Sequence, residues 1–425
     1  MRNIREAPGA CDRASIVNVA RKVGPGRVNN PAPRGLIPPA RPDNVAPTAA
    51  VTLDISSFFP ARCNDKPGDD QTSRNGLQTF GFGETCRVSP KQPKPPIDPV
   101  RWTPPPVDPL PEFPSAELTI VAVPGNAPED VVVDADGQIW TGVDDGRIVR
   151  ISSDGDNTTV VADTGGRPLG LHVARDGGLL ICDSPRGLLR LDPGTGELQT
   201  LVDDVDNRKL TFCSNVTELA DGTIYFTEST SAFTYVHSVA AVLEARARGS
   251  LFRRDPDGTV LTVVPGLYFA NGLTLTADAS ALVFAELQAR RLMKYWLSGP
   301  MAGTVTPLVE NLPGMPDNLS TGSDGRIWCA FFAPANAAAD RLAKGAPLVR
   351  KLLWRLPESL HPKPESTVWA VAFDPDTGAP VAGVRTEHPA FGQVTGMVEA
   401  NGKLWMGCLG APAVAHVDLP ATALR

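Results

Sequence analysis

The chain has 425 residues, of which 42% are apolar and 20% charged, as in ordinary globular proteins. Residues 1–100 carry 14 Lys and Arg against 9 Asp and Glu, a net charge of +5, whereas the remainder carries 26 against 38, or −12. So acidic a body excludes nucleic acid as a partner, and the lack of any run of ~20 apolar residues excludes a membrane-spanning segment.

The N-terminal part is rich in proline. Residues 1–117 hold 21 of the 42 prolines and show no sustained apolar periodicity. Because proline blocks both helices and sheet ladders, residues 1–115 are predicted to form a largely disordered extension, and a folded domain is predicted over 116–425. The piece from Arg101 onward is expected to lie against that domain.

Seven cysteines occur without any C-x-x-C pair. A Cys63–Cys86 disulfide stays open as an alternative for an exported chain, but the N-terminus lacks the apolar core of a secretory signal, which favours the cytoplasm. The four cysteines in apolar runs are predicted to be buried free thiols: Cys182, Cys213, Cys329 and Cys408.

From residue 116 onward one phrase recurs six times: a polar turn, usually Asp-Gly, followed by a β-rich run. The copies read "DADGQIWTG", "ARDGGLLICD", "LADGTIYFTE", "TADASALVFAE", "GSDGRIWCAF" and "EANGKLWMGC", with turns 40 to 77 residues apart. Each copy is followed by a second strand and most by a third. Repeats of this length with several strands predict an all-β fold, a six-bladed β-propeller.

The two ends of the repeat region are complementary. A strand-like segment at 116–123 precedes the first repeat, and the sixth repeat reaches the C-terminus without an obvious outer strand. We expect the N-terminal strand to pair into the last blade and close the ring, because closure removes an exposed sheet edge.

Two long insertions interrupt the repeats, at 229–250 and 335–360. The first has Val236, Val239 and Leu243 at helical spacing, and the second also has helical stretches. Both are predicted to lie on one face and to cover the mouth of the central channel. Loops without a function are an equally good interpretation of the second.

The segments just before each turn supply candidate site residues. In a propeller the first strand of every blade faces the axis, so these segments converge from six directions. They offer carboxylate, amide, hydroxyl and imidazole groups: Glu129, His172, Ser214 or Asn215, Asn271 and Asp317. Hard oxygen donors are the ligands that Ca²⁺ prefers. The sequence has no cluster of His and Cys of the kind that binds zinc.

Several stretches resemble one protein family. "FANGLTLTADASALVFAELQARRLMKYWLSG" at 269–299 resembles the signature of the strictosidine synthase-like family, which groups with gluconolactonase and regucalcin-type six-bladed propellers. The resemblance implies a metal, usually calcium, in the central channel, with the family's Glu at Glu129, its second Asn at Asn271 and its Asp at Asp317. The family's first Asn falls on Ser214, or on Asn215 if a bulge presents that residue.

The resemblance implies calcium-dependent hydrolysis of a lactone or related ester by an activated water, with Asp317 or His172 as the base. Two other functions stay open: a non-hydrolytic enzyme that forms carbon–carbon bonds, as the family's name suggests, and a non-catalytic propeller that binds calcium or a ligand. The expected partner is a small-molecule substrate, with no nucleic acid and no membrane. Neither the substrate nor the oligomeric state follows from the residues.

Overall fold

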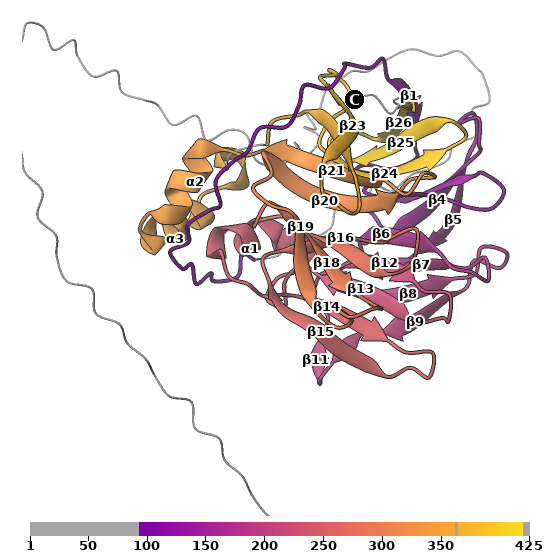
Figure 1. Cartoon of the computed structure of the whole chain (residues 1–425). Coiled ribbons are helices and arrows are strands. Elements are labelled where there is room, and N and C mark those ends of the chain that lie inside the picture. Colours follow the sequence, from indigo (N-terminus) through magenta and orange to yellow (C-terminus); the bar gives the residue numbers. More distant parts are fainter. Residues whose placement is uncertain (1–92, 362–363, 420–425) are drawn as a thin grey trace, which may run out of the picture. The chain divides into compact units, whose positions relative to one another are not determined.

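The computed structural model describes residues 93–361 and 364–419 (Figure 1). The predicted disorder of the earlier part of the extension and the Cys63–Cys86 alternative both lie outside these residues.

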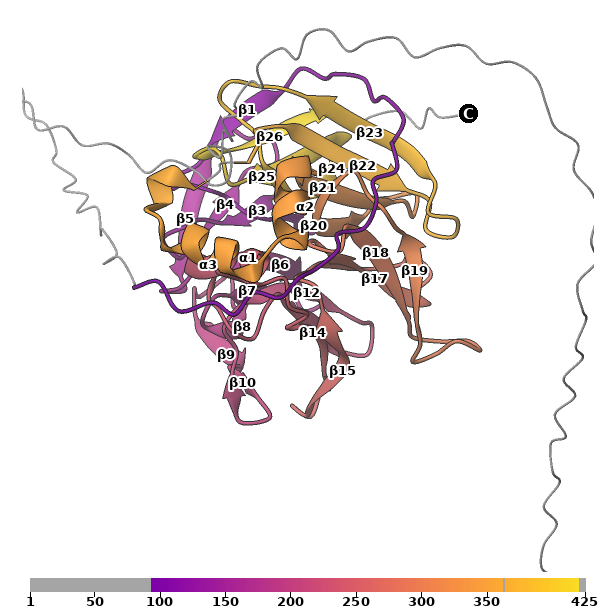
Figure 2. The same ribbon diagram turned by 90° about the vertical axis from the view of Figure 1, so that its left-hand side faces the viewer.

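The described residues form six four-stranded antiparallel sheets around a common axis, which confirms the predicted six-bladed β-propeller. Figure 2 looks along this axis and shows the sheets, called blades 1 to 6 in chain order, arranged in a ring. In blades 1 to 5 the strands pair in sequence order, from the axial strand outward, whereas the outermost strand of blade 6 comes from the start of the propeller.

From the axis outward, blade 1 consists of β2 (Val131–Val133), β3 (Ile139–Gly142), β4 (Arg147–Ile151) and β5 (Thr158–Asp163). Blade 2 consists of β6 (Pro168–Val173), β7 (Leu179–Asp183), β8 (Gly187–Leu191) and β9 (Leu198–Val202). Blade 3 consists of β12 (Cys213–Glu218), β13 (Ile224–Glu228), β14 (Gly249–Arg254) and β15 (Val260–Leu267). A small hairpin of β10 (Asp204–Val205) and β11 (Arg208–Lys209) links blades 2 and 3.

Blade 4 consists of β16 (Ala270–Leu275), β17 (Ala281–Glu286), β18 (Arg291–Trp296) and β19 (Val305–Val309). Blade 5 consists of β20 (Gly314–Thr321), β21 (Ile327–Pro334), β22 (Val368–Phe373) and β23 (Pro380–Thr386). Blade 6 consists of β24 (Val394–Ala400), β25 (Lys403–Cys408), β26 (Ala413–Asp418) and β1 (Thr119–Ala122).

The recurring turn joins the axial strand to the next strand of each blade. In blade 1, Gly137 has φ 76°, and the Asp134 carboxylate accepts hydrogen bonds from the backbone N–H groups of Asp136 and Gln138. Such left-handed backbone favours glycine, which explains the Asp-Gly pattern. Ala279 occupies this position in blade 4 and is held at φ 55°.

The N-terminal strand closes the ring, as predicted. β1 pairs antiparallel with β26, with Thr119 opposite His416 and Ala122 opposite Ala413. Val121 of β1 also packs in a buried cluster that joins blade 6 to blade 1. Blade 6 therefore contains strands from both ends of the propeller, and β1 supplies its fourth and outermost strand.

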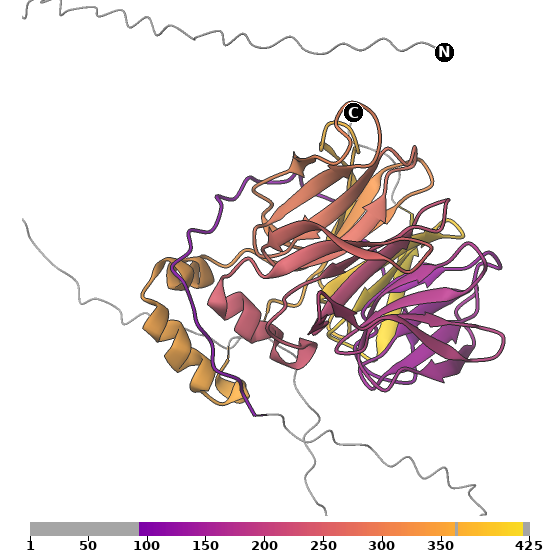
Figure 3. The ribbon, with the colours of Figure 1, turned by 90° about the horizontal axis from the view of Figure 1, so that it is seen from below.

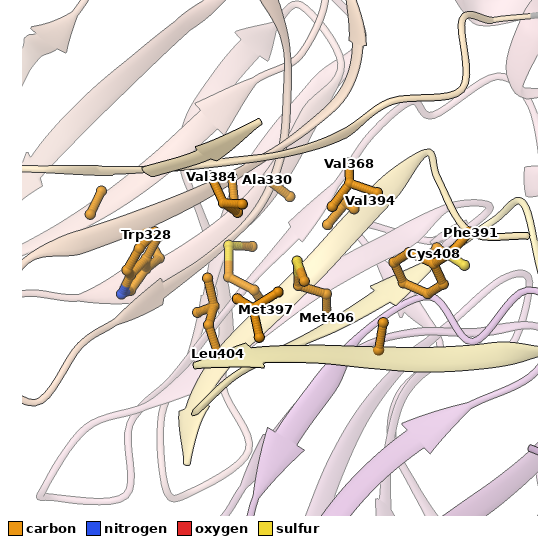
Figure 4. Close-up of a cluster of buried hydrophobic side chains, with 14 of the residues drawn as sticks. Trp328, Ala330, Val368, Val384, Phe391, Val394, Met397, Leu404, Met406 and Cys408 are labelled. Atoms are coloured by element: carbon orange, nitrogen blue, oxygen red, sulfur yellow. The ribbon is translucent and has the colours of Figure 1, made fainter. Parts of the chain in front are cut away.

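The core consists of apolar layers between neighbouring blades. Figure 4 shows the layer between blades 5 and 6, where Trp328 and Val368 of blade 5 face Met397, Leu404 and Met406 of blade 6. Similar layers lie between every other pair of neighbours. The four cysteines expected to be buried free thiols are buried and free, which confirms that prediction.

Both insertions are helical and lie over one face of the propeller, as predicted (Figure 3). The helices are η1 (Tyr235–His237), α1 (Ser238–Glu244), α2 (Ala337–Lys344), α3 (Pro347–Arg355) and η2 (Glu358–Leu360). Their apolar side chains pack on residues at the start of the axial strands, including Leu169, Phe212 and Phe269. We call these helices the cap. None of the helices described is long and apolar enough to cross a membrane.

The described end of the extension crosses the cap in extended form and then follows the blades. Val100 N–H donates to Glu244 O at 2.9 Å, and Asp108 N–H donates to Asn311 O at 2.8 Å. The expectation that the piece from Arg101 lies against the propeller is therefore confirmed.

Candidate functional site

In blades 1 to 5 the axial segment brings one residue to an equivalent position, two residues before the start of regular pairing: Glu129, Leu169, Ser214, Asn271 and Asp317. In blade 6 regular pairing resumes at Gly396, and we add Thr395, whose hydroxyl donates to Glu129 O at 2.6 Å. All six are buried. We call this set the upper ring, because it lies at the end of the axial strands nearest the cap.

Polar members of the upper ring bond directly to one another. Ser214 Oγ donates to Asn271 Oδ1 at 2.9 Å, and Asn271 Nδ2 donates to Asp317 Oδ1 at 2.5 Å. Three side chains that are 57 and 46 residues apart in the chain thus form one continuous line across blades 3, 4 and 5.

A second line of hydrogen bonds runs just below. Asn215 Nδ2 donates to Asn318 Oδ1 at 3.0 Å, and Asn318 Nδ2 donates to Glu129 Oε2 at 3.3 Å. Asn215 Oδ1 accepts from Val216 N–H at 2.9 Å, so both ends of this amide are already engaged. The structure therefore brings five of the six candidate residues into one buried polar region.

The residues that follow the upper ring alternate between polar side chains and glycine, which the sequence interpretation missed. Asp130, Asn215 and Asn318 fill the axis, and each has a glycine of the preceding blade beside it. A Cβ at Gly170 would lie 2.5 Å from Asn215 Cα, one at Gly272 2.5 Å from Asn318 Cα, and one at Gly396 2.8 Å from Asp130 Cα. The alternation itself was a readable signal.

The carboxylates of the site raise one another's pKa. Burial raises the pKa of Glu129 well above its usual range, and the nearby charges of Asp317 and Asp130 add to the effect. Burial likewise raises the pKa of Asp317, although the hydrogen bond from Asn271 opposes this. Burial raises the pKa of Asp130 to about 7. Three buried carboxylates in one place require a compensating cation or protons.

Arg167 supplies one positive charge beside this region and lowers the pKa of Glu129. Its Nη2 donates to Ala127 O at 2.9 Å, and its guanidinium lies 4.9 Å from the centre of the Tyr235 ring. The side chain is buried, and its Nε and Nη1 have no hydrogen-bond partner among the described residues. Arg167 is a second residue that the sequence interpretation did not single out.

The donor set fits a hard cation better than a transition metal. Among the described residues no three His, Cys, Asp or Glu side chains group closely enough to hold a metal by themselves. A cation here would therefore need amide and hydroxyl oxygens beside the carboxylates of Glu129 and Asp317. Asn271 and Ser214 offer such oxygens, and this mixture is typical of calcium.

His172 lies apart from the two lines of hydrogen bonds. It is three residues beyond Leu169 on β6, which corresponds to about 10 Å of extended strand. Burial lowers its pKa to about 4, so the imidazole is neutral at neutral pH. The residue of blade 2 that shares the level of Asp317 is Leu169.

The chain matches two family models. One is the SMP-30/gluconolactonase/LRE-like region, over residues 139–345, and the other is the strictosidine synthase-like N-terminal model, over residues 116–151. Among curated relatives, STRICTOSIDINE SYNTHASE-LIKE 4 of Arabidopsis thaliana is 30% identical over 303 residues, covering 69% of this chain and 80% of the relative. The adipocyte plasma membrane-associated protein of Salmo salar is 31% identical, covering 66% and 73%.

Solved structures share the fold at low identity. A gluconolactonase from Xanthomonas campestris superposes with a TM-score of 0.53 at 18% identity, covering 79% of this chain and all (100%) of that one. A regucalcin from Agrobacterium tumefaciens, described as a calcium-binding protein, gives 0.52 at 16%, covering 73% and 96%.

Fold and axial site together define a six-bladed propeller with a buried acidic and amide centre. More particularly, the chain belongs to the strictosidine synthase-like family, as its motifs indicated.

Proposed function

We propose that this protein is a calcium-dependent hydrolase of a lactone or related ester, acting at the upper ring. The observation that carries the proposal is the meeting of Glu129, Asn271 and Asp317 with Ser214 on the axis, beneath the cap. Carboxylate, amide and hydroxyl oxygens at one buried point suit a calcium ion, and two carboxylates balance its formal charge.

Each polar residue of the upper ring has a distinct role in this proposal. Glu129, Asn271, Asp317 and Ser214 would hold the cation, which would supply a Lewis acid for the carbonyl oxygen. The second oxygen of Asp317 accepts the proton of the attacking water. His172 remains the alternative base, at a disadvantage because of its distance along β6. The cap excludes bulk water and limits the substrate to a small molecule.

Ser214 rather than Asn215 is proposed as the ligand from blade 3. The oxygen of Asn215 accepts the Val216 N–H, and its nitrogen donates to Asn318. Ser214 Oγ, by contrast, bonds to Asn271 within the upper ring. A hydroxyl at this position is a shorter ligand than the asparagine usual in the family, so weak calcium binding is expected.

The test is hydrolysis of a panel of lactones and aryl esters by the full chain, with calcium and with excess chelator. We expect turnover that is lost with chelator and in Asp317→Asn, while calorimetry shows calcium binding to the unaltered protein. Asp376→Asn is the matched control, because that carboxylate is 89% exposed on the surface. Turnover that survives both chelator and Asp317→Asn would exclude the mechanism.

A second function, non-catalytic binding of calcium or a ligand, is favoured by one observation: Ser214 stands where the family usually has asparagine. In that case calcium binding, abolished by Asp317→Asn, would accompany inactivity across the whole panel.

A further inference from the structure

Helix α3 of the cap exposes aliphatic side chains and buries an arginine, unlike an ordinary surface helix. It buries Arg350 and Trp354, whereas Leu348, Val349 and Leu352 are 63%, 51% and 55% exposed. A helix at the surface of a globular protein usually does the reverse, with its apolar stripe facing the core.

Specific contacts hold this orientation. Arg350 Nη1 donates to Leu243 O at 2.9 Å, at the C-terminal turn of α1, and its Nη2 donates to Val100 O. Trp354 Nε1 donates to Pro95 O at 2.7 Å. The buried side of α3 is thus occupied by partners from α1 and the extension, and Leu348 and Leu352 face outward.

The exposed large apolar side chains of this segment are Leu348, Val349 and Leu352 of α3, Leu356 directly after it and Leu360 of η2, and we call them the apolar patch. The other exposed large apolar side chains of the described residues are scattered over other elements. Figure 3 shows α3 on the far side of α1 from the blades. Because Arg350, on the buried side of α3, contacts Leu243 of α1, the exposed side chains lie on the side turned away from α1. A gathering of exposed apolar side chains marks a binding surface more often than chance placement.

Basic residues are frequent in the segment that carries the apolar patch. Residues 335–360 contain five Lys and Arg against two Asp and Glu, on a body that is otherwise strongly acidic. Three of them, Arg341, Lys344 and Arg355, are exposed and form no ion pair with any described residue. Asp340, one of the two acidic residues, is paired with Arg290 at 3.0 Å.

We propose that this face of the cap binds an anionic lipid bilayer, with α3 lying in the plane of the membrane surface. Aliphatic side chains on one side with Lys and Arg at the margin are the features of an interfacial helix, which inserts its apolar side and keeps its cations at the headgroups. Such binding needs no spanning segment, but it departs from the expectation, drawn from the sequence, that the protein has no membrane partner. It is also independent of the hydrolysis proposed above.

Charge argues against the chain's own N-terminal segment as the occupant. Residues 1–92 carry 13 Lys and Arg against 8 Asp and Glu, a net +5, and would be repelled by the basic margin of the patch. The same segment precedes Lys94, whose Nζ lies 4.6 Å from the centre of the Trp354 ring. The positive charge of residues 1–92 would add to the attraction of the whole chain toward an anionic surface.

The experiment is co-sedimentation of the full chain with vesicles of phosphatidylcholine alone and of phosphatidylcholine mixed with phosphatidylserine. We expect binding to the mixed vesicles that weakens as salt is added. The triple variant Leu348→Ser, Leu352→Ser, Leu356→Ser should lower the partition constant by roughly tenfold or more, because several methylene groups no longer enter the bilayer. The matched control is Val160→Ser, Leu261→Ser, Val305→Ser, which alters exposed apolar residues of β5, β15 and β19.

A second variant, Lys344→Glu with Arg355→Glu, leaves the leucines in place. It should reduce binding to the vesicles that contain phosphatidylserine and leave any binding to pure phosphatidylcholine vesicles unchanged. Thermal melting of each variant verifies the fold. Equal vesicle binding by the leucine variant and its control would overturn the proposal, as would no binding at all. Dimers in sedimentation velocity that dissociate in the leucine variant, without vesicle binding, would assign the patch to a second copy of the chain instead.

Discussion

At the scale of single residues, Ser214 sets how strongly the site can hold a cation. Its hydroxyl reaches Asn271 at 2.9 Å, whereas the family's usual asparagine places an amide oxygen about one bond further from the backbone. We expect Ser214→Asn to tighten calcium binding about tenfold, since an amide oxygen is a stronger ligand for calcium than a hydroxyl. Calorimetric titration would measure the change. Unaltered affinity would mean that blade 3 contributes no ligand through this position.

His172 makes the stability of the fold depend on pH. Burial lowers its pKa to about 4 in the folded protein, whereas an unfolded histidine titrates near 6.5. The unfolded state therefore takes up a proton first, so stability is complete above pH ~6.5 and is lost as the pH falls toward 4.

His172→Gln should therefore reduce the loss of unfolding free energy between pH 7.5 and pH 4.5 by roughly 2 kcal/mol. Urea unfolding at several pH values measures this difference. Because only the slope matters, a constant change in stability from altered packing cancels. A slope identical to that of the unaltered protein would show that His172 does not titrate in this way.

At the scale of elements, the glycines beside the axis decide how closely the blades approach. A Cβ at Gly272 would lie 2.5 Å from both Asn318 Cα and Leu319 N, which are backbone atoms that cannot move aside. Gly272→Ala should destabilise the protein by about 3 kcal/mol and weaken calcium binding, since β16 and β20 must separate where Asn271 meets Asp317.

The control for this change is Gly194→Ala, in a surface turn where the nearest atom to a new Cβ is an Asp192 carboxylate oxygen at 3.3 Å. Thermal and urea unfolding of both variants would compare the two sites. Similar small losses in both would show that blades 4 and 5 separate without strain.

At the scale of the whole molecule, closure depends on β1. Removing residues 1–122 leaves blade 6 with three strands and bares the outer edge of β26. We expect this truncated chain to aggregate and to lose several kcal/mol of stability, because an unpaired edge invites association and the layer between blades 6 and 1 loses Val121.

A chain that begins at residue 93 is the control, since it keeps every contact of β1. Light scattering and thermal melting would compare the two truncations. Equal light scattering and equal melting temperatures of the two truncated chains would mean that blade 6 is stable without β1.

The sequence by itself determined the repeating elements. Asp-Gly turns recur because left-handed backbone favours glycine, and β-rich runs recur because every blade needs them; both signals are local. The number of blades, closure through residues 116–123, the helical insertions and the polar residues of five axial segments could therefore be predicted before any coordinates.

Only the tertiary structure decided which of those polar residues meet. The level of a side chain on the axis depends on the bulge and register of its strand, and these are set by pairing with strands distant in the chain. Hence Ser214 lies beside Asn271 and Asp317, whereas His172 lies three residues beyond Leu169, the upper-ring residue of β6. The outward leucines of α3 were equally hidden, because periodicity identifies an apolar side of a helix but not the direction it faces, which here depends on the partners of Arg350 and Trp354.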